Sequence, residues 1–168
     1  MKFVVRALIL TSVLAVAACS NPDRFGDDVY LNGGGAAGVA GSVDDPTSPL
    51  YFQQAVGDRI FFAVDQSTLS DAAKLTLDGQ AEWLSTNGDF SAIIEGHADE
   101  QGTREYNLAL GARRANTVQE YLVSRGVSPS RLKVVSYGKE RPIEICSVES
   151  CYAKNRRAVT VISAGMSS

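Results

Sequence analysis

The stretch "EGHADEQGTREYNLALGARRA", residues 95–115, connects an apolar segment to an acidic turn and then to a helical pattern. The overlapping segment "FSAIIEGHAD" (90–99) is rich in apolar and branched residues, which indicates a β-strand. Thr103 is a favourable N-cap, and the pattern after it predicts a helix that runs to about Arg125. A strand, a turn and a helix therefore follow one another, with charged residues on both sides of the turn.

The helix after Thr103 should lie on the sheet through one apolar stripe, formed by Leu108, Ala112, Ala115, Val118 and Leu122. Asn107, Leu110 and Arg114 fall on one flank of that stripe, and seven-residue spacing stacks Asn107 and Arg114 two turns apart. Asp99 closes the preceding strand at the same end. We expect an acid, an amide and a guanidinium to line one cleft at the top of the sheet. The alternative is that Arg114 is a surface residue and Asp99 an ordinary turn acid.

Beyond residue 50, the rest of the chain alternates between segments with helical periodicity and segments with the pattern of a strand. Strands are predicted at 58–64, 132–138 and 158–163, a helix at 70–87 and a short helical turn near 153–157. This order, β-α-β-α-β-β, is typical of an α+β fold: a two-layer sandwich of about four strands with two main helices on one sheet face. The pattern does not determine the order of the strands.

The N-terminus has the features of an export signal. Lys2 and Arg6 precede an apolar run over 7–18, which is too short to span a bilayer. The run ends in "VAAC" (16–19), which resembles the lipobox of bacterial lipoproteins and implies cleavage before Cys19 and its lipidation. The alternative is an ordinary signal peptide. Ser20, in place of the Asp that retains many such lipoproteins at the inner membrane, favours the outer membrane.

These features divide the chain into three parts. We expect a signal peptide over 1–18, a lipidated cysteine and flexible tether over 19–50, and a folded domain over 51–168. The net charge of −3 shows no basic excess, so no nucleic-acid partner is expected. Disulfides persist outside the cytoplasm, so Cys146 and Cys151 are expected to pair, with a stabilisation of only roughly 2 kcal/mol because the loop is small.

The residue inventory argues against catalysis. His97 is the only histidine, so neither an H-E-x-x-H motif nor any other histidine-pair zinc site can form. No G-x-S-x-G motif occurs. A two-carboxylate glycosidase using Asp65, Asp99 and Glu100 stays open in principle, but one Trp offers little surface for stacking sugars. We expect no enzyme activity, no metal and no cofactor, and we expect His97 to be packed at the strand end.

Three blocks occur in order: "IEGHADEQGTREYNLALGARRANTVQEYLVSRGV", "VSYGKERP" and "YAKNRRAV". Over about residues 57–162 the chain resembles the OmpA-like peptidoglycan-binding domain family, and within it is most similar to the peptidoglycan-associated lipoproteins. The resemblance implies the OmpA-like sandwich and non-covalent binding of peptidoglycan through the diaminopimelate of its stem peptide. It further implies a link between the outer membrane and the cell wall, with the domain facing the periplasm. The Tol–Pal system, with TolB and TolA as partners in envelope integrity and cell division, is implied by the resemblance alone.

The resemblance also assigns roles to residues. At the position of Asp99 the family has an aspartate that receives the ligand ammonium, and at that of Arg114 an arginine that holds its carboxylate. The other ligand-binding positions are Asn107, Leu110, Thr103 and Asp65. Diaminopimelate carries an amine and a carboxylate on one carbon, so a fixed anion and a planar, bidentate cation suit it. The fold is expected to tolerate alanine at Asp99 or Arg114.

One departure from the family lies in the first strand. Many members have "FDFD" where this chain has "FFAVD" (61–65), so Ala63 and Val64 give a smaller and less polar wall. Two alternatives remain open: a wall-binding lipoprotein outside the Tol system, such as an adhesin-like surface antigen, and an enzyme that modifies the wall.

Overall fold

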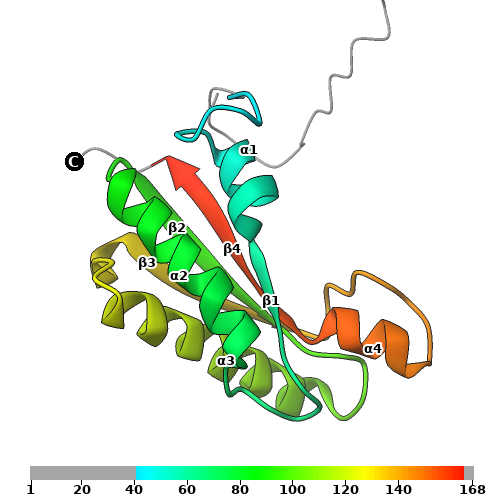
Figure 1. Ribbon diagram of the computed structural model, residues 1–168. Coiled ribbons are helices and arrows are strands. Elements are labelled where there is room, and N and C mark those ends of the chain that lie inside the picture. Colours follow the sequence, from blue (N-terminus) through cyan, green and yellow to red (C-terminus); the bar gives the residue numbers. More distant parts are fainter. Residues whose placement is uncertain (1–40, 165–168) are drawn as a thin grey trace, which may run out of the picture. The chain divides into compact units, whose positions relative to one another are not determined.

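A computed structural model describes residues 41–164, and within them four strands form a single sheet (Figure 1). The sheet order is β1-β4-β2-β3. The central strand β2 runs parallel to β3 and antiparallel to β4, and β4 also pairs antiparallel with β1. The strands are β1 (Arg59–Phe61), β2 (Phe90–His97), β3 (Leu132–Gly138) and β4 (Arg157–Ala164).

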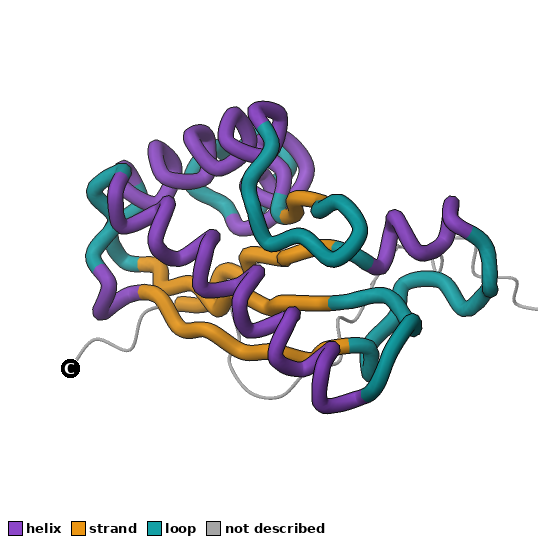
Figure 2. Tube along the Cα trace, turned by 90° about the horizontal axis from the view of Figure 1, so that it is seen from below, coloured by secondary structure: helices purple, strands orange, loops and turns teal. Residues whose placement is uncertain are grey.

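The two long helices α2 and α3 cover the same face of this sheet (Figure 2), which confirms the predicted two-layer α+β sandwich. Both begin where a hydroxyl caps the first turn: Ser70 accepts from the amide of Ala73, and Thr103 from that of Tyr106. The helices are α1 (Pro49–Tyr51), the π-helical η1 (Phe52–Gly57), α2 (Asp71–Thr86), α3 (Arg104–Ser124), the 3-10 turn η2 (Pro129–Arg131) and α4 (Glu149–Asn155).

The first folded residues lie earlier than the sequence predicts. Trp83 donates its indole N–H to the carbonyl of Pro46 at 2.7 Å, and the buried Ser48 caps the amide of Tyr51 at 3.0 Å. Residues 46–50, assigned to the tether, therefore contact the domain, and helices α1 and η1 follow them. The predicted signal peptide, the lipidation site Cys19 and the tether up to residue 40 lie outside the described residues.

Helix α3 packs through the predicted Ala115, Val118 and Leu122, but in its first turns it buries the predicted flank instead of Leu108. Its buried residues are Asn107, Leu110, Gly111, Arg114, Ala115, Val118 and Leu122, whereas Leu108 is 47% exposed. The cause is a direct backbone contact between Gly111 and Gly96 of β2. A Cβ on Gly96 would lie only 1.8 Å from the carbonyl oxygen of Gly111. The face of α3 that meets the sheet is thus centred on Gly111, which has no side chain. With Gly111 at the contact, Asn107 and Arg114 also face inward.

The hydrophobic core lies between the sheet and the two helices. Trp83 joins the early helical segment to the sheet, because its ring is 4.9 Å from that of Phe52 and 5.3 Å from that of Phe90. Among the polar contacts between the sheet and the helices, the hydroxyl of Thr160 donates to the buried amide oxygen of Gln80 at 2.7 Å. The core holds the sheet and helices as one unit, so the ends of β1 and β2 are fixed relative to α3.

His97 is packed at the end of β2, on the sheet face that α2 and α3 do not cover. Its side chain is almost fully buried, and its ring stacks on that of Tyr137 with centroids 5.6 Å apart. Glu95 Oε2 lies 3.5 Å from Nε2, but neither ring nitrogen has a hydrogen-bond partner among the described residues. Burial, and then the charges of Arg157 and Arg141, lower the pKa of His97 to about 4.

The contact between Gly96 and Gly111 leads to a prediction about stability. Gly96→Ala should destabilise the domain by about 1–3 kcal/mol or more, because the methyl group overlaps a helix backbone that cannot yield as a side chain would. Urea unfolding followed by circular dichroism measures this. Gly88→Ala is the matched control, since no atom lies within 4 Å of the added Cβ there. Equal midpoints for the two variants would show that the helix does not rest on Gly96.

The buried His97 predicts acid sensitivity. Its folded-state pKa of about 4 lies below the ordinary histidine pKa of 6.5, so the unfolded chain takes up the proton first and stability falls as the pH drops from 6.5 towards 4. Between pH 7 and pH 5, the wild-type domain should lose about 2 kcal/mol more than His97→Phe. Urea titrations of both proteins at the two pH values test this, and parallel losses would contradict it.

Candidate ligand-binding site

Two connections meet at the end of the sheet where β2 finishes: the β1–α2 loop and the β2–α3 turn. Asp99 lies two residues beyond β2, and Thr103 caps α3. Asn107 is buried and donates its side-chain amide to the carbonyl of Gln101 at 2.7 Å, which fixes the turn against the helix. Leu110, one turn further along α3, is also buried. These predicted site residues therefore come together around the start of α3.

Arg114 is completely buried, with 0% of its surface exposed. Its Nε donates to the carbonyl of Gln66 at 2.8 Å, Nη1 to that of His97 at 2.8 Å, and Nη2 to that of Ala63 at 3.1 Å. The guanidinium carbon also lies 5.1 Å from the centre of the Phe62 ring. One side chain of α3 thus ties the β1–α2 loop to the end of β2.

The guanidinium of Arg114 keeps its charge and part of its donor capacity. Burial lowers the pKa of Arg114 to about 10, and the negative charge of Asp99 opposes that shift, so the group is cationic at neutral pH. A guanidinium has five N–H donors, and three are used within the described residues, which leaves one on each terminal nitrogen. A carboxylate, with two acceptor oxygens, is a suitable partner for the remaining donors of a guanidinium.

Asp99 is paired with a residue that the sequence reasoning did not single out, Arg156. Asp99 Oδ2 accepts from Arg156 Nη1 at 3.2 Å, and Oδ1 accepts from the amide of Gln101 at 3.2 Å. Arg156 is itself buried, and its Nε donates to the carbonyl of Phe62 at 3.3 Å. It lies in the "YAKNRRAV" block, whose local sequence pattern does not indicate a charge at the site.

Asp65 lies in the loop that covers Arg114. Its backbone has a φ of +56°, a left-handed conformation that aspartate tolerates better than most residues. The hydroxyl of Tyr106 donates to its carboxylate, so α3 holds this loop from a second side. Val64 is 54% exposed beside it. The departure from the family pattern therefore presents an apolar side chain to solvent next to the site.

The structure corrects one expectation about Arg114. Alanine at this position would leave three carbonyls without their donor and a cavity in place of the guanidinium, so the fold does not tolerate it freely. The charge of Asp99 acts on Arg114, but the two side chains form no direct ion pair in the described structure. Each is held by other groups in the same site.

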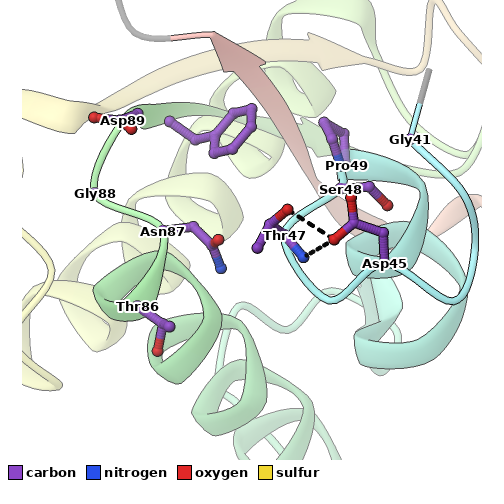
Figure 3. Close-up of a pocket in the computed structure, with 10 residues that line it drawn as sticks. Gly41, Asp45, Thr47, Ser48, Pro49, Thr86, Asn87, Gly88 and Asp89 are labelled. Carbon is purple, nitrogen blue, oxygen red and sulfur yellow. Dashed lines mark hydrogen bonds between the residues drawn. The ribbon is translucent and has the colours of Figure 1, made fainter. Parts of the chain in front are cut away.

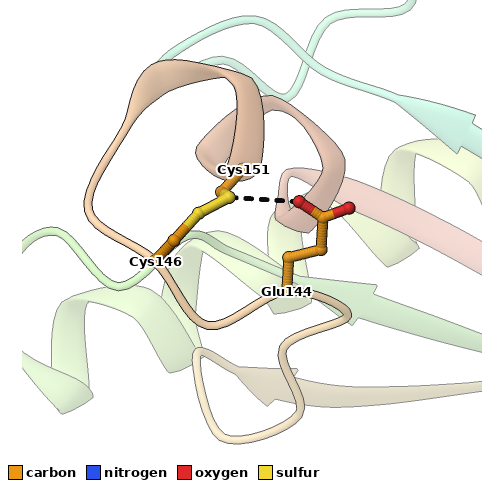
Figure 4. Close-up of side chains that lie close together, drawn as sticks. All are labelled: Glu144, Cys146 and Cys151. Carbon is orange, nitrogen blue, oxygen red and sulfur yellow. Dashed lines mark hydrogen bonds between the residues drawn. A yellow bond between two sulfur atoms is a disulfide. The ribbon is translucent and has the colours of Figure 1, made fainter.

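The expected disulfide between Cys146 and Cys151 is present, with their Cα atoms 6.1 Å apart (Figure 4). Glu144 Oε2 lies 3.1 Å from Cys151 Sγ, and the three side chains form a group of possible metal ligands. Because a disulfide sulfur carries no proton, that contact is not a hydrogen bond. Both sulfurs are committed to the disulfide, so this group offers a metal ion little more than one carboxylate.

A pocket of about 340 Å³ lies at the other end of the sheet (Figure 3), between residues 41–49 and the loop at 86–90. Two acids line it, Asp45 and Asp89, and Asp45 already accepts from the amide and the hydroxyl of Thr47, at 2.9 and 2.7 Å. It contains none of the predicted site residues, and no basic side chain lines it to pair with an acid. Among residues 41–164, no helix is long and apolar enough to cross a membrane.

The OmpA family matches residues 61–156 of the chain. The peptidoglycan-associated lipoprotein of Mesorhizobium japonicum is 49% identical over 93% of this chain and 90% of its own length. That of Pseudomonas aeruginosa is 42% identical over 90% of this chain and 91% of its own.

Solved structures agree. The peptidoglycan-associated lipoprotein of Burkholderia pseudomallei has a TM-score of 0.64 at 36% identity, over 72% of this chain and 98% of its own. The C-terminal domain of Helicobacter pylori MotB shares the fold, with a TM-score of 0.60 at 22% identity over 65% of this chain and 86% of its own. The chain belongs to the OmpA family and, within it, to the peptidoglycan-associated lipoproteins.

Proposed function

We propose that the domain binds the peptidoglycan stem peptide non-covalently and grips the headgroup of its diaminopimelate between Asp99 and Arg114. The observation that carries this proposal is the convergence of two opposite charges, from the β2–α3 turn and from α3, at one end of the sheet. Both groups are nearly or fully buried, so an ion reaching them leaves most of its water behind. Interactions with charges are stronger in such an environment.

The proposed chemistry uses the hydrogen-bonding capacity that the fold leaves free at the site. The ligand carboxylate accepts the two unused N–H groups of Arg114, and the ammonium donates to Asp99 in place of Arg156. Because Arg114 is fully enclosed, the loop at 63–66 has to move aside for the carboxylate to reach it. Asn107 and Leu110 keep the helix start in place beneath the ligand.

We extend the proposal to the cell envelope. A lipid on Cys19 would anchor the chain in the outer membrane, and the domain would hold the wall from the periplasmic side. Two acyl chains or more give a stable anchor, whereas one binds only marginally. The names of the relatives support wall association. TolB and TolA as partners, in envelope integrity and cell division, rest on the resemblance to the peptidoglycan-associated lipoproteins.

Two experiments separate this function from its alternatives. Co-purification with TolB after detergent extraction supports the Tol system, and its absence favours a wall-binding lipoprotein with another role. Incubation of the purified domain with sacculi, followed by chromatography of the supernatant, detects an enzyme by the muropeptides that it releases. We expect TolB to co-purify and no muropeptides to appear.

Conservative substitutions test the two charges. Asp99→Asn and Arg114→Lys should each weaken binding to purified sacculi by roughly 2–4 kcal/mol, since each leaves one charge of the ligand or of the site unmatched. Lysine at 114 keeps the charge but loses the planar fork. Pull-down of the domain with sacculi measures the bound fraction.

Matched controls are available for both substitutions. Arg113→Lys changes the exposed neighbour of Arg114, and Asp89→Asn changes an exposed acid beyond the other end of β2. Both should bind like the wild-type domain. If Asp99→Asn and Arg114→Lys are folded in thermal melts and still bind sacculi as well as the wild type, the proposed grip by Asp99 and Arg114 is refuted.

A further inference from the structure

Two acids, Asp99 and Glu149, share Arg156. Only Asp99 belongs to the proposed clamp, which is the pair Asp99 and Arg114. Arg156 Nη1 lies 3.2 Å from Asp99 Oδ2 and 3.4 Å from Glu149 Oε2, and Nη2 pairs with Glu149 Oε1. The side chains of Asp99 and Arg156 are 10% and 6% exposed, whereas that of Glu149 is 66% exposed. A buried cation therefore connects the clamp to an acid on the surface.

Glu149 owes its position to a constrained segment. It is the first residue of α4, and the disulfide between Cys146 and Cys151 spans this helix start (Figure 4). The amide of Cys151 donates to the carbonyl of Val148 at 3.0 Å, closing the turn. At the other end of α4, the side chain of Asn155 accepts from the amide of Ile143 at 2.8 Å. Both ends of this short helix are thus tied to the loop before it.

The position of Arg156 matters because a ligand ammonium and this guanidinium would compete for Asp99. Like charges brought together in a poorly hydrated site repel each other strongly. Glu149 counters that repulsion in two ways: it neutralises part of the charge of Arg156, and it gives the guanidinium a second partner when Asp99 turns to the ligand. Without Glu149, Arg156 has Asp99 as its only carboxylate partner among residues 41–164.

We propose that Glu149, held by the disulfide-linked start of α4, is a positioning residue that keeps Asp99 available for the ligand ammonium by retaining Arg156. This inference rests on the proposed function. It gives a role to a residue and to a disulfide that the proposed function does not use. Glu149 need not touch the ligand, since its effect passes through Arg156.

The test measures binding of a synthetic stem peptide that contains meso-diaminopimelate, by calorimetry with the folded domain. Glu149→Gln should weaken binding about 3-fold to 10-fold at low salt, since a partly exposed ion pair contributes modestly. The loss should shrink at high salt, because screening acts on charges near the surface. Glu149→Asp, which keeps the charge, should restore most of the affinity. Glu144→Gln is the matched control, because it removes the same charge from the loop just before α4, and Glu144 pairs with Lys154.

A second variant tests the role of the covalent link. Cys146→Ser with Cys151→Ser should weaken binding in the same direction, and adding Glu149→Gln to it should cost little more. Residues that act through one contact show such non-additive effects. Circular dichroism and a thermal melt confirm that the double-serine protein is folded before its binding is measured.

The outcomes are distinguishable. If the wild-type domain fails to bind the peptide, the proposed function itself fails. If the wild type binds and Glu149→Gln binds equally well, or if Glu149→Asp loses as much as Glu149→Gln, the positioning role is refuted. Tighter binding by Glu149→Gln would also overturn it, because Glu149 would then be competing with the ligand for Arg156. Fully additive losses with the serine pair would separate the disulfide from Glu149.

Discussion

The burial of Arg114 is the constraint on which the rest of the site depends. Taking a guanidinium out of water is costly, and the fold offsets that cost with three backbone carbonyls from two separate segments. The same bonds hold the β1–α2 loop against the end of β2, just before the turn that leads to α3. The close contact between Gly96 and Gly111 makes this burial possible, because it brings the helix near enough to the sheet.

The charges around Arg114 alternate in sign and differ by one, with two cations among three anions. The arginines Arg114 and Arg156 lie among the acids Asp99, Asp65 and Glu149. A ligand headgroup with one ammonium and one carboxylate adds no net charge to such a set, so binding would exchange one paired arrangement for another. A ligand with a single charge would leave a buried group unmatched, and that penalty would give the site its selectivity.

Local signals predicted much of this structure from the sequence. Ser70 and Thr103 marked the helix starts because capping is a local interaction, and dense apolar runs located β2 and β3. The predicted stripe of α3 was right over the second half of the helix and wrong at Leu108, because Gly111 carries no hydrophobic signal although the helix rests on it. Arg156 was missed for another reason: its partner Asp99 is 57 residues away, and no periodicity encodes such a pairing. The strand order was likewise beyond the sequence pattern.

Trp83 and the proposed binding residues Asp99 and Arg114 lie at opposite ends of the sheet, and this has a mechanical consequence. The chain enters the domain near Pro46, which Trp83 holds close to the start of β2, whereas Asp99 follows the end of that strand. Tension between a membrane anchor and a wall-bound ligand would therefore run along the length of β2. Its hydrogen bonds to β3 and β4 lie across that direction and would resist together in shear, instead of opening one by one as in a peeled edge.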